Sequence, residues 1–219
     1  MALLPLVPSA HPSAWTAEPD GAGREAVVHS VFERDRHACR FCGHAAAGWQ
    51  EVFHRDGDHD NWGADNLVTA CPLCHAVQHL GRPNVLQEQV LIWLPEMSQA
   101  ALNCVVRCIH LTLHAHGEPA HGGELPRSDD PTVYAALRAY QALQAEARTL
   151  ERRIHTSNPR ELGAVLLDLS PYAHSRQAEL LGGIRLLHRG RDFRAGRDVY
   201  PKMLAAWAEG AAAPRAEAA

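Results

Sequence analysis

Two CxxC pairs, about thirty residues apart, constrain this chain more than any other feature of its 219 residues. Cys39 and Cys42 form the first pair, and Cys71 and Cys74 form the second. Each pair is predicted to lie in a tight turn, a knuckle, which aims two thiolates at one point. Four sulfurs in a tetrahedral array are a common structural zinc site. The spacing therefore predicts one structural Zn²⁺ bound by these four cysteines, and the alternative is four unrelated buried cysteines.

The segment between the two pairs is longer than in a simple zinc ribbon. It is patterned as two short strands around the polar turn residues Asp56-Gly57 and Trp62-Gly63, which predicts a β-hairpin. Helical character returns after Cys74 and ends at Gly81 and Pro83. The predicted order is thus knuckle, hairpin, knuckle, helix.

Charge and cysteine usage narrow the class of protein. The formal net charge is -4, which argues against a protein that coats nucleic acid, because such domains are usually basic. We find no convincing secretion signal, so metal-bound thiolates in a reducing cytoplasm fit the six cysteines better than disulfides. No apolar run reaches the roughly 18 residues that a membrane span requires, and we expect no direct membrane insertion.

Helix caps and apolar spacing predict an α+β chain in which a zinc module precedes a mainly helical C-terminal half. Helices are expected at residues 24–35, 98–116, 131–155, 159–169, 172–181 and 198–209, and strands at 89–94 and 184–187. The predicted N-caps of the first four helices are, in order, Asp20, Ser98, Asp130 and Asn158. The predicted division is an extended N-terminal arm (1–20), the zinc module with flanking helices (21–117), a linker (118–130), a helical region (131–209) and a disordered tail (210–219).

Two further clusters have a structural and a functional interpretation. Cys104 and Cys108 lie one helical turn apart with three histidines nearby, yet free cysteines in an apolar helix are usually small core residues rather than metal ligands. Five arginines between residues 185 and 197 could bind phosphate, but a solvated charged loop is the favoured interpretation.

Residues 33–80 resemble the ββα-metal, or HNH, nucleases built on a zinc scaffold. In that family a His-His or Asp-His pair begins the hairpin: the first member binds a divalent cation and the second activates water. The resemblance places His54 at the general-base position and Asn66 at the asparagine that holds the hairpin. It makes His75 and His79, four residues apart on a helix, candidate metal ligands.

One residue departs from the nuclease pattern. Phe53 occupies the first position of the pair, and a phenyl ring has no lone pair for a metal. Two imidazoles alone should hold Mg²⁺ poorly, because Mg²⁺ prefers oxygen ligands. We therefore expect the nuclease frame without nuclease activity. The alternatives are a metal-dependent HNH endonuclease that uses His54 as general base, and a zinc ribbon that binds nucleic acid without catalysis.

A second resemblance covers more of the chain. The runs VFERDRHACRFCG, NLVTACPLCHAVQHL and VLIWLPEMSQAALN are similar to the IcmJ (DotN) family of type IVB (Dot/Icm) secretion systems, and the LPEMSQ segment is the discriminating part. The resemblance implies an HNH-like fold with a four-cysteine zinc and no catalytic role. It implies an adaptor that docks on the coupling ATPase DotL, in a complex with DotM that recruits effectors. Such a protein would be cytoplasmic and peripheral to the inner membrane through its partners.

Overall fold

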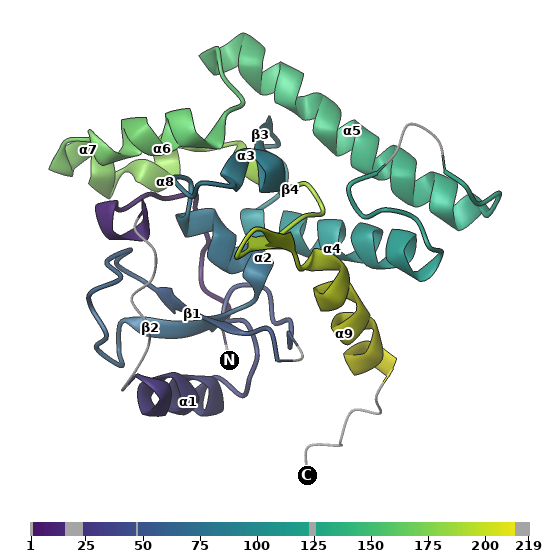
Figure 1. Cartoon of the computed structure of the whole chain (residues 1–219). Coiled ribbons are helices and arrows are strands. Elements are labelled where there is room, and N and C mark those ends of the chain that lie inside the picture. Colours follow the sequence, from purple (N-terminus) through teal and green to yellow (C-terminus); the bar gives the residue numbers. More distant parts are fainter. Residues whose placement is uncertain (1, 16–23, 47, 123–125, 213–219) are drawn as a thin grey trace.

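The structure is a computed structural model that describes residues 2–15, 24–46, 48–122 and 126–212 (Figure 1). The first part contains a short N-terminal 3-10 helix, a helix, a β-hairpin and a second helical turn. Their bounds are η1 (Pro12–Trp15), α1 (Glu25–Arg34), β1 (Glu51–His54), β2 (Leu67–Ala70), α2 (Pro72–His75) and η2 (Ala76–Gln78). The strands are antiparallel with Phe53 opposite Val68, so the predicted hairpin is present.

A buried carboxylate fastens α1 to this hairpin. Asp35 follows the last residue of α1 and its side chain is fully buried. It accepts hydrogen bonds from Arg34, from Arg40 and, at 2.8 Å, from the backbone N–H of Thr69 in β2. The hydrogen bonds of Asp35 therefore connect α1, the first knuckle and the hairpin.

A second antiparallel sheet joins segments that are far apart in the sequence. Strand β3 (Gln89–Trp93) follows the short helix α3 (Val85–Glu88) and pairs with β4 (Ile184–His188). The register sets Leu91 opposite Leu186. Small sheets and many helices together confirm the predicted α+β class.

The long helices begin at the predicted caps. Helix α4 (Gln99–Ala115) is capped by Ser98, α5 (Pro131–Ile154) by Asp130 and α6 (Pro159–Leu167) by Asn158. In each case the side-chain oxygen accepts a backbone N–H of the first turn, which satisfies a donor that the helix itself cannot. Proline at the first helical position of α5 and α6 reinforces the start.

The C-terminal elements differ in detail from the predicted ones. The helix expected at 172–181 is two short helices, α7 (Pro171–Ser175) and α8 (Gln177–Leu180), and α9 (Tyr200–Ala212) extends beyond the expected end at 209. A small hairpin of β5 (Phe193–Arg194) and β6 (Arg197–Asp198) replaces part of the expected loop. The helix cap expected at Asp20 lies outside the described residues, and α1 has no side-chain cap.

The larger of two hydrophobic clusters in the described residues extends through both halves of the chain. It includes the metal-knuckle cysteines, the apolar faces of α4 and α5, and the fully buried Tyr200, Met203 and Trp207 of α9. The Trp207 indole donates to the carbonyl of Ala46 at 3.0 Å, which ties α9 to the first knuckle. The predicted regions 21–117 and 131–209 thus share buried surface, while their status as separate domains stays a prediction.

None of the helices in the described part of the chain has the length and apolar character that crossing a bilayer requires.

Candidate metal centre

The first knuckle is shaped by backbone hydrogen bonds around Cys39. The N–H of Cys39 donates to the carbonyl of His44, and the N–H of Gly43 donates back to the carbonyl of Cys39 at 2.8 Å. Gly43 has a φ of 74°, a conformation that glycine adopts without the strain of a Cβ atom. This tight turn brings the side chains of Cys39 and Cys42 to the same side.

The second knuckle is the start of helix α2. Cys71 is its N-cap in an extended conformation, followed by Pro72, and its carbonyl accepts the N–H groups of Cys74 and His75. The first helical turn therefore sets Cys74 on the same side as Cys71. A helix start and a hairpin-like turn supply two thiols each.

The four sulfurs meet in the core. They all lie within 4.8 Å of one another, and Cys42 Sγ is 3.7 Å from Cys71 Sγ. Four ligands about 2.3 Å from a tetrahedral zinc lie roughly 3.8 Å apart, so this arrangement fits the ion closely. Cys39, Cys71 and Cys74 are at most 2% exposed, and Cys42 is half-buried. The cluster is compatible with one bound metal ion, and all-thiolate tetrahedral donors favour Zn²⁺.

The thiols influence one another strongly. Hydrogen bonds from Cys39, Cys71 and Cys74 lower the pKa of Cys42, whereas hydrogen bonds with Cys39 and Cys42 raise the pKa of Cys71 and Cys74 well above the usual value. Four neighbouring sulfurs cannot all ionise without a compensating charge. A bound dication supplies that charge and holds all four as thiolates.

Helix α4 supplies two contacts to the sulfurs that sequence reasoning missed. Arg107 donates from one guanidinium nitrogen to Cys42 Sγ at 3.7 Å, and Asn103 donates to Cys74 Sγ at 3.3 Å. A zinc ion bound by four thiolates would give the site two net negative charges, and the Arg107 cation would offset part of them. Groups that hydrogen-bond to metal ligands orient those ligands and tune the properties of the metal site.

A chain of amide groups connects the second knuckle to the β3–β4 sheet. Asn103 accepts a hydrogen bond from Gln99, whose amide also donates to the carbonyl of Leu186 and accepts the N–H of Leu186 at 2.8 Å. Gln99 is the last residue of the LPEMSQ segment, which explains one physical use of that segment. Without the fold, no signal in the sequence relates Gln99 to a strand 87 residues away.

Phe53 and the three nuclease-like histidines, His54, His75 and His79, are brought together but are buried. Phe53 is 7% exposed and packs on Phe41 with ring centroids 4.6 Å apart, so its ring belongs to the core. His54 is 2% exposed and stacks on His59, a residue that sequence analysis did not single out. Neither ring nitrogen of His54 has a hydrogen-bond partner among the described residues. Burial, with His59 and His75 nearby, lowers the pKa of His54 to about 4.

His75 and His79 face each other. Their Nε2 atoms are 3.2 Å apart, and His75 Nδ1 is 2.7 Å from a carboxylate oxygen of Glu51. Burial would raise the pKa of Glu51, but His75 and Arg194 outweigh it and lower that pKa to about 2. Within the described part of the chain, only the four cysteines gather three or more potential metal donors within 4.8 Å. The metal-binding role of His75 and His79 stays a prediction.

Asn66 holds the hairpin loop, as its predicted position suggests. Its side-chain oxygen accepts the N–H of Asp56, and its Nδ2 donates to Asp56 Oδ1 at 2.9 Å and to the carbonyl of Asn61. This network fixes the loop that follows His54. It gives Asn66 a structural use that does not depend on catalysis.

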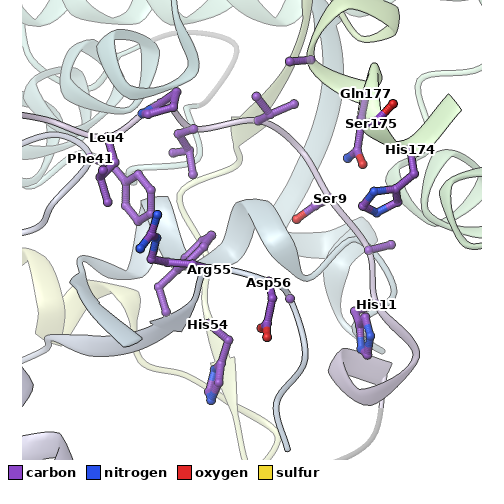
Figure 2. Close-up of a pocket in the computed structure, with 17 residues that line it drawn as sticks. Leu4, Ser9, His11, Phe41, His54, Arg55, Asp56, His174, Ser175 and Gln177 are labelled. Atoms are coloured by element: carbon purple, nitrogen blue, oxygen red, sulfur yellow. The ribbon is translucent and has the colours of Figure 1, made fainter. Parts of the chain in front are cut away.

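A cavity of about 400 Å³ lies beside the hairpin (Figure 2). The N-terminal segment forms one wall, and residues 53–57 and the α7–α8 region form others. Figure 2 shows the His54 side chain extending from the hairpin and His174 on the opposite wall. The N-terminal segment is held by Leu4 N–H to Arg40, Ser9 N–H to Val77, and Gln177 to Pro8. These contacts hold the N-terminal segment beside the end of β1 and the loop that follows it.

The residues of the other two clusters lie in different parts of the fold. His110 is fully buried and bonds Tyr200 at 2.8 Å, so it does not join Cys104 and Cys108 in a donor cluster of the described residues. Of the five arginines, Arg185, Arg189 and Arg194 contact protein groups: the carbonyls of Met97 and Leu86, and the carboxylates of Glu51 and Asp192. Most of this arginine run stabilises the fold.

Comparison with known proteins supports one of the two predicted resemblances. No family model matches the chain. The chain is 28% identical over 168 residues to a protein of Legionella pneumophila subsp. pneumophila (strain Philadelphia 1) described as type 4 apparatus protein DotN. The match covers 75% of this chain and 72% of that relative. The predicted resemblance to the IcmJ/DotN family is confirmed. The DotN match does not test the HNH-like character of the module, which stays a prediction.

Proposed function

We propose that this chain is a non-catalytic, zinc-stabilised subunit of a type IVB secretion apparatus. The similarity to DotN carries the proposal, because it extends over three quarters of the chain rather than over the knuckles alone. From the family resemblance we further propose that the chain docks on the coupling ATPase DotL, in a complex with DotM, at the cytoplasmic face of the inner membrane. In that role the chain helps to recruit effector proteins.

The buried centre supports an adaptor better than an enzyme. A metal held by Cys39, Cys42, Cys71 and Cys74 would stabilise a rigid scaffold, since structural zinc contributes on the order of 10 kcal/mol to folding. The predicted general base, His54, is 2% exposed, stacks on His59 and meets the Trp62 ring edge-on. A base must reach the water that it activates, and this imidazole has little access to solvent.

Co-purification tests the adaptor role. Tagged protein is expressed at its native level in the cells that encode it, and membranes are solubilised before capture. Enrichment of a membrane-anchored coupling ATPase and of a DotM-like protein is the expected result. A capture that contains neither, while the tagged protein remains folded and loaded with zinc, contradicts the proposal.

A metal-dependent HNH endonuclease is the second candidate, favoured by the meeting of His54, His59, His75 and His79 in one buried cluster. Purified protein is incubated with plasmid DNA and Mg²⁺, Mn²⁺ or Ni²⁺. We expect no metal-dependent cleavage. Cleavage that disappears in His54→Ala and persists in His29→Ala, an exposed histidine of α1, would establish the enzyme instead.

The same preparation tests nucleic-acid binding without cleavage. Phosphate contacts release counterions, so such binding would weaken steeply with added salt. We expect no salt-sensitive DNA binding at physiological ionic strength.

A further inference from the structure

A fifth cysteine lies against the proposed metal centre. Cys104, on α4, directs its sulfur to within 3.9 Å of the carbonyl oxygen of Cys42. The Arg107 guanidinium contacts both sulfurs, with one nitrogen 3.7 Å from Cys42 Sγ and another 3.6 Å from Cys104 Sγ.

Solvent access also distinguishes Cys42 from the other three proposed ligands. Cys39, Cys71 and Cys74 are 0–2% exposed, whereas Cys42 and Cys104 are both half-buried. A small oxidant in solution therefore meets Cys42 before the other three ligands. Cys42, the most accessible of the four ligands, lies in the first knuckle, and Cys104 lies on α4. These two elements pack against each other at this point.

We propose that Cys42 and Cys104 are a peroxide-oxidisable pair, whose disulfide withdraws one ligand from the metal centre. The proposal rests on the four-cysteine zinc site proposed above. It assigns Cys104 a role outside that ligand set, as the thiol that resolves oxidised Cys42.

The chemistry balances with hydrogen peroxide as the oxidant. The Cys42 thiolate attacks one peroxide oxygen, the O–O bond breaks, and hydroxide leaves, so Cys42 becomes a sulfenic acid. The Cys104 thiol then attacks the Cys42 sulfur: an S–S bond forms, the S–O bond breaks, and the hydroxyl departs with the thiol proton as water. Two sulfurs are oxidised and one peroxide is reduced. Arg107, which touches both sulfurs, stabilises the negative charge that develops.

Helix α4 provides a matched control. Cys108 lies one turn beyond Cys104 and is exposed. Cys104→Ser and Cys108→Ser therefore make the same chemical change on the same helix, but only the first removes a thiol that contacts the centre.

The test uses the full chain loaded with one equivalent of zinc under anaerobic conditions. Hydrogen peroxide is added, released zinc is followed with a colorimetric chelator, and disulfide-linked peptides are located by tandem mass spectrometry. We expect a Cys42–Cys104 link and zinc release that thiol reductant reverses. Because an intramolecular thiol acts at high effective concentration, Cys104→Ser should slow zinc release about fivefold or more, and Cys108→Ser should match the unmodified protein.

The outcomes separate the two proposals. Equal release rates in the two variants, or Cys42 linked only to Cys39, Cys71 or Cys74, would overturn the pairing. Absence of bound zinc before oxidation would overturn the metal proposal, and the linked peptide would then decide the Cys42–Cys104 pairing by itself.

Discussion

At the scale of single residues, the sequence predicts some of the buried polar side chains of this fold and misses others. The cysteines were predictable because two CxxC pairs are a strong local signal. Arg107 and Asn103 were not, because their contacts with the sulfurs arise only when α4 packs on the knuckles. The burial of His54 escaped prediction for a similar reason: its ring neighbours His59 and Trp62 come from the loop that follows β1, whose path the sequence does not specify.

Asp35 provides the first prediction at the residue scale. Although burial opposes its ionisation, hydrogen bonds from Arg34, Thr69 and Arg40 lower its pKa below the usual value. Replacing Asp35 leaves the buried N–H of Thr69 without its acceptor, and hydrogen bonds to a charged group typically contribute about 1.5–3 kcal/mol. We expect Asp35→Ala to lower the free energy of unfolding by a value in that range. Urea denaturation measures it, with the exposed Asp60→Ala as the control, which should change stability by less than about 0.5 kcal/mol.

His110 and His188 predict a dependence of stability on pH. Burial lowers the pKa of His110 well below its usual value, and burial, with Arg82 nearby, lowers the pKa of His188 to about 3. Both residues are therefore neutral in the folded state, while an unfolded histidine takes up a proton near pH 6.5. Their contribution is fully present above pH 6.5 and is lost as the pH falls from there toward 3.

The measurement compares variants over an interval in which zinc content is unchanged. Between pH 7 and 5.5 each such histidine should cost about 1 kcal/mol of unfolding free energy. We expect His110→Gln to reduce the loss over this interval by about that amount, and the exposed His29→Gln to leave it unchanged. Identical pH profiles for all three proteins would show that His110 is not the titrating group.

At the scale of elements, the sequence predicts features that depend on local signals and does not predict features that depend on long-range pairing. Ser98, Asp130 and Asn158 cap helices where they were predicted, because a cap acts on its own first turn. The pairing of β3 with β4 brings together segments about ninety residues apart, and no local pattern specifies it. The domain division drawn from composition likewise could not foresee that β4 completes a sheet with the zinc module.

The two knuckles predict how the chain depends on its metal. We expect Cys71→Ser to unfold or aggregate the protein, because Cys71 is fully buried and binding of a structural zinc contributes on the order of 10 kcal/mol. Cys104→Ser should be tolerated. Chelation of the metal from unmodified protein should lower the melting temperature by a similar extent to Cys71→Ser. Zinc content by elemental analysis and thermal melts check these outcomes together, and equal stability of the two variants would contradict the assignment.

The β3–β4 sheet predicts a steric requirement at its edge. Gly183, just before β4, has a φ of 93°, and a Cβ atom there would lie 2.6 Å from the Trp93 ring. Gly196 has a φ of 74° with no atom within 4 Å of its Cβ position. Both Gly→Ala changes strain the backbone, but only Gly183→Ala also displaces Trp93. We expect Gly183→Ala to cost at least about 1 kcal/mol more than Gly196→Ala in denaturant unfolding.

At the scale of the whole molecule, the last helix closes the structure on its first knuckle. Figure 1 shows α9 below α4. Trp207 is 2% exposed, its ring lies 5.1 Å from that of His44, and its indole bonds the Ala46 carbonyl. A metal bound at the knuckles and the docking of α9 would therefore stabilise the same segment, residues 44–46. We infer that the two halves of the chain unfold as one cooperative unit.

Substitutions of Trp207 test this cooperativity. Trp207→Ala removes a large buried ring and should cost about 3–5 kcal/mol. Trp207→Phe keeps most of the apolar contact but leaves the Ala46 carbonyl without its donor, so it should cost about 1–3 kcal/mol. If the halves are coupled, both variants should also accelerate the loss of zinc to a chelator, with Trp207→Ala faster. A variant that lowers the melting temperature but leaves zinc exchange unchanged would show that α9 and the metal centre act independently.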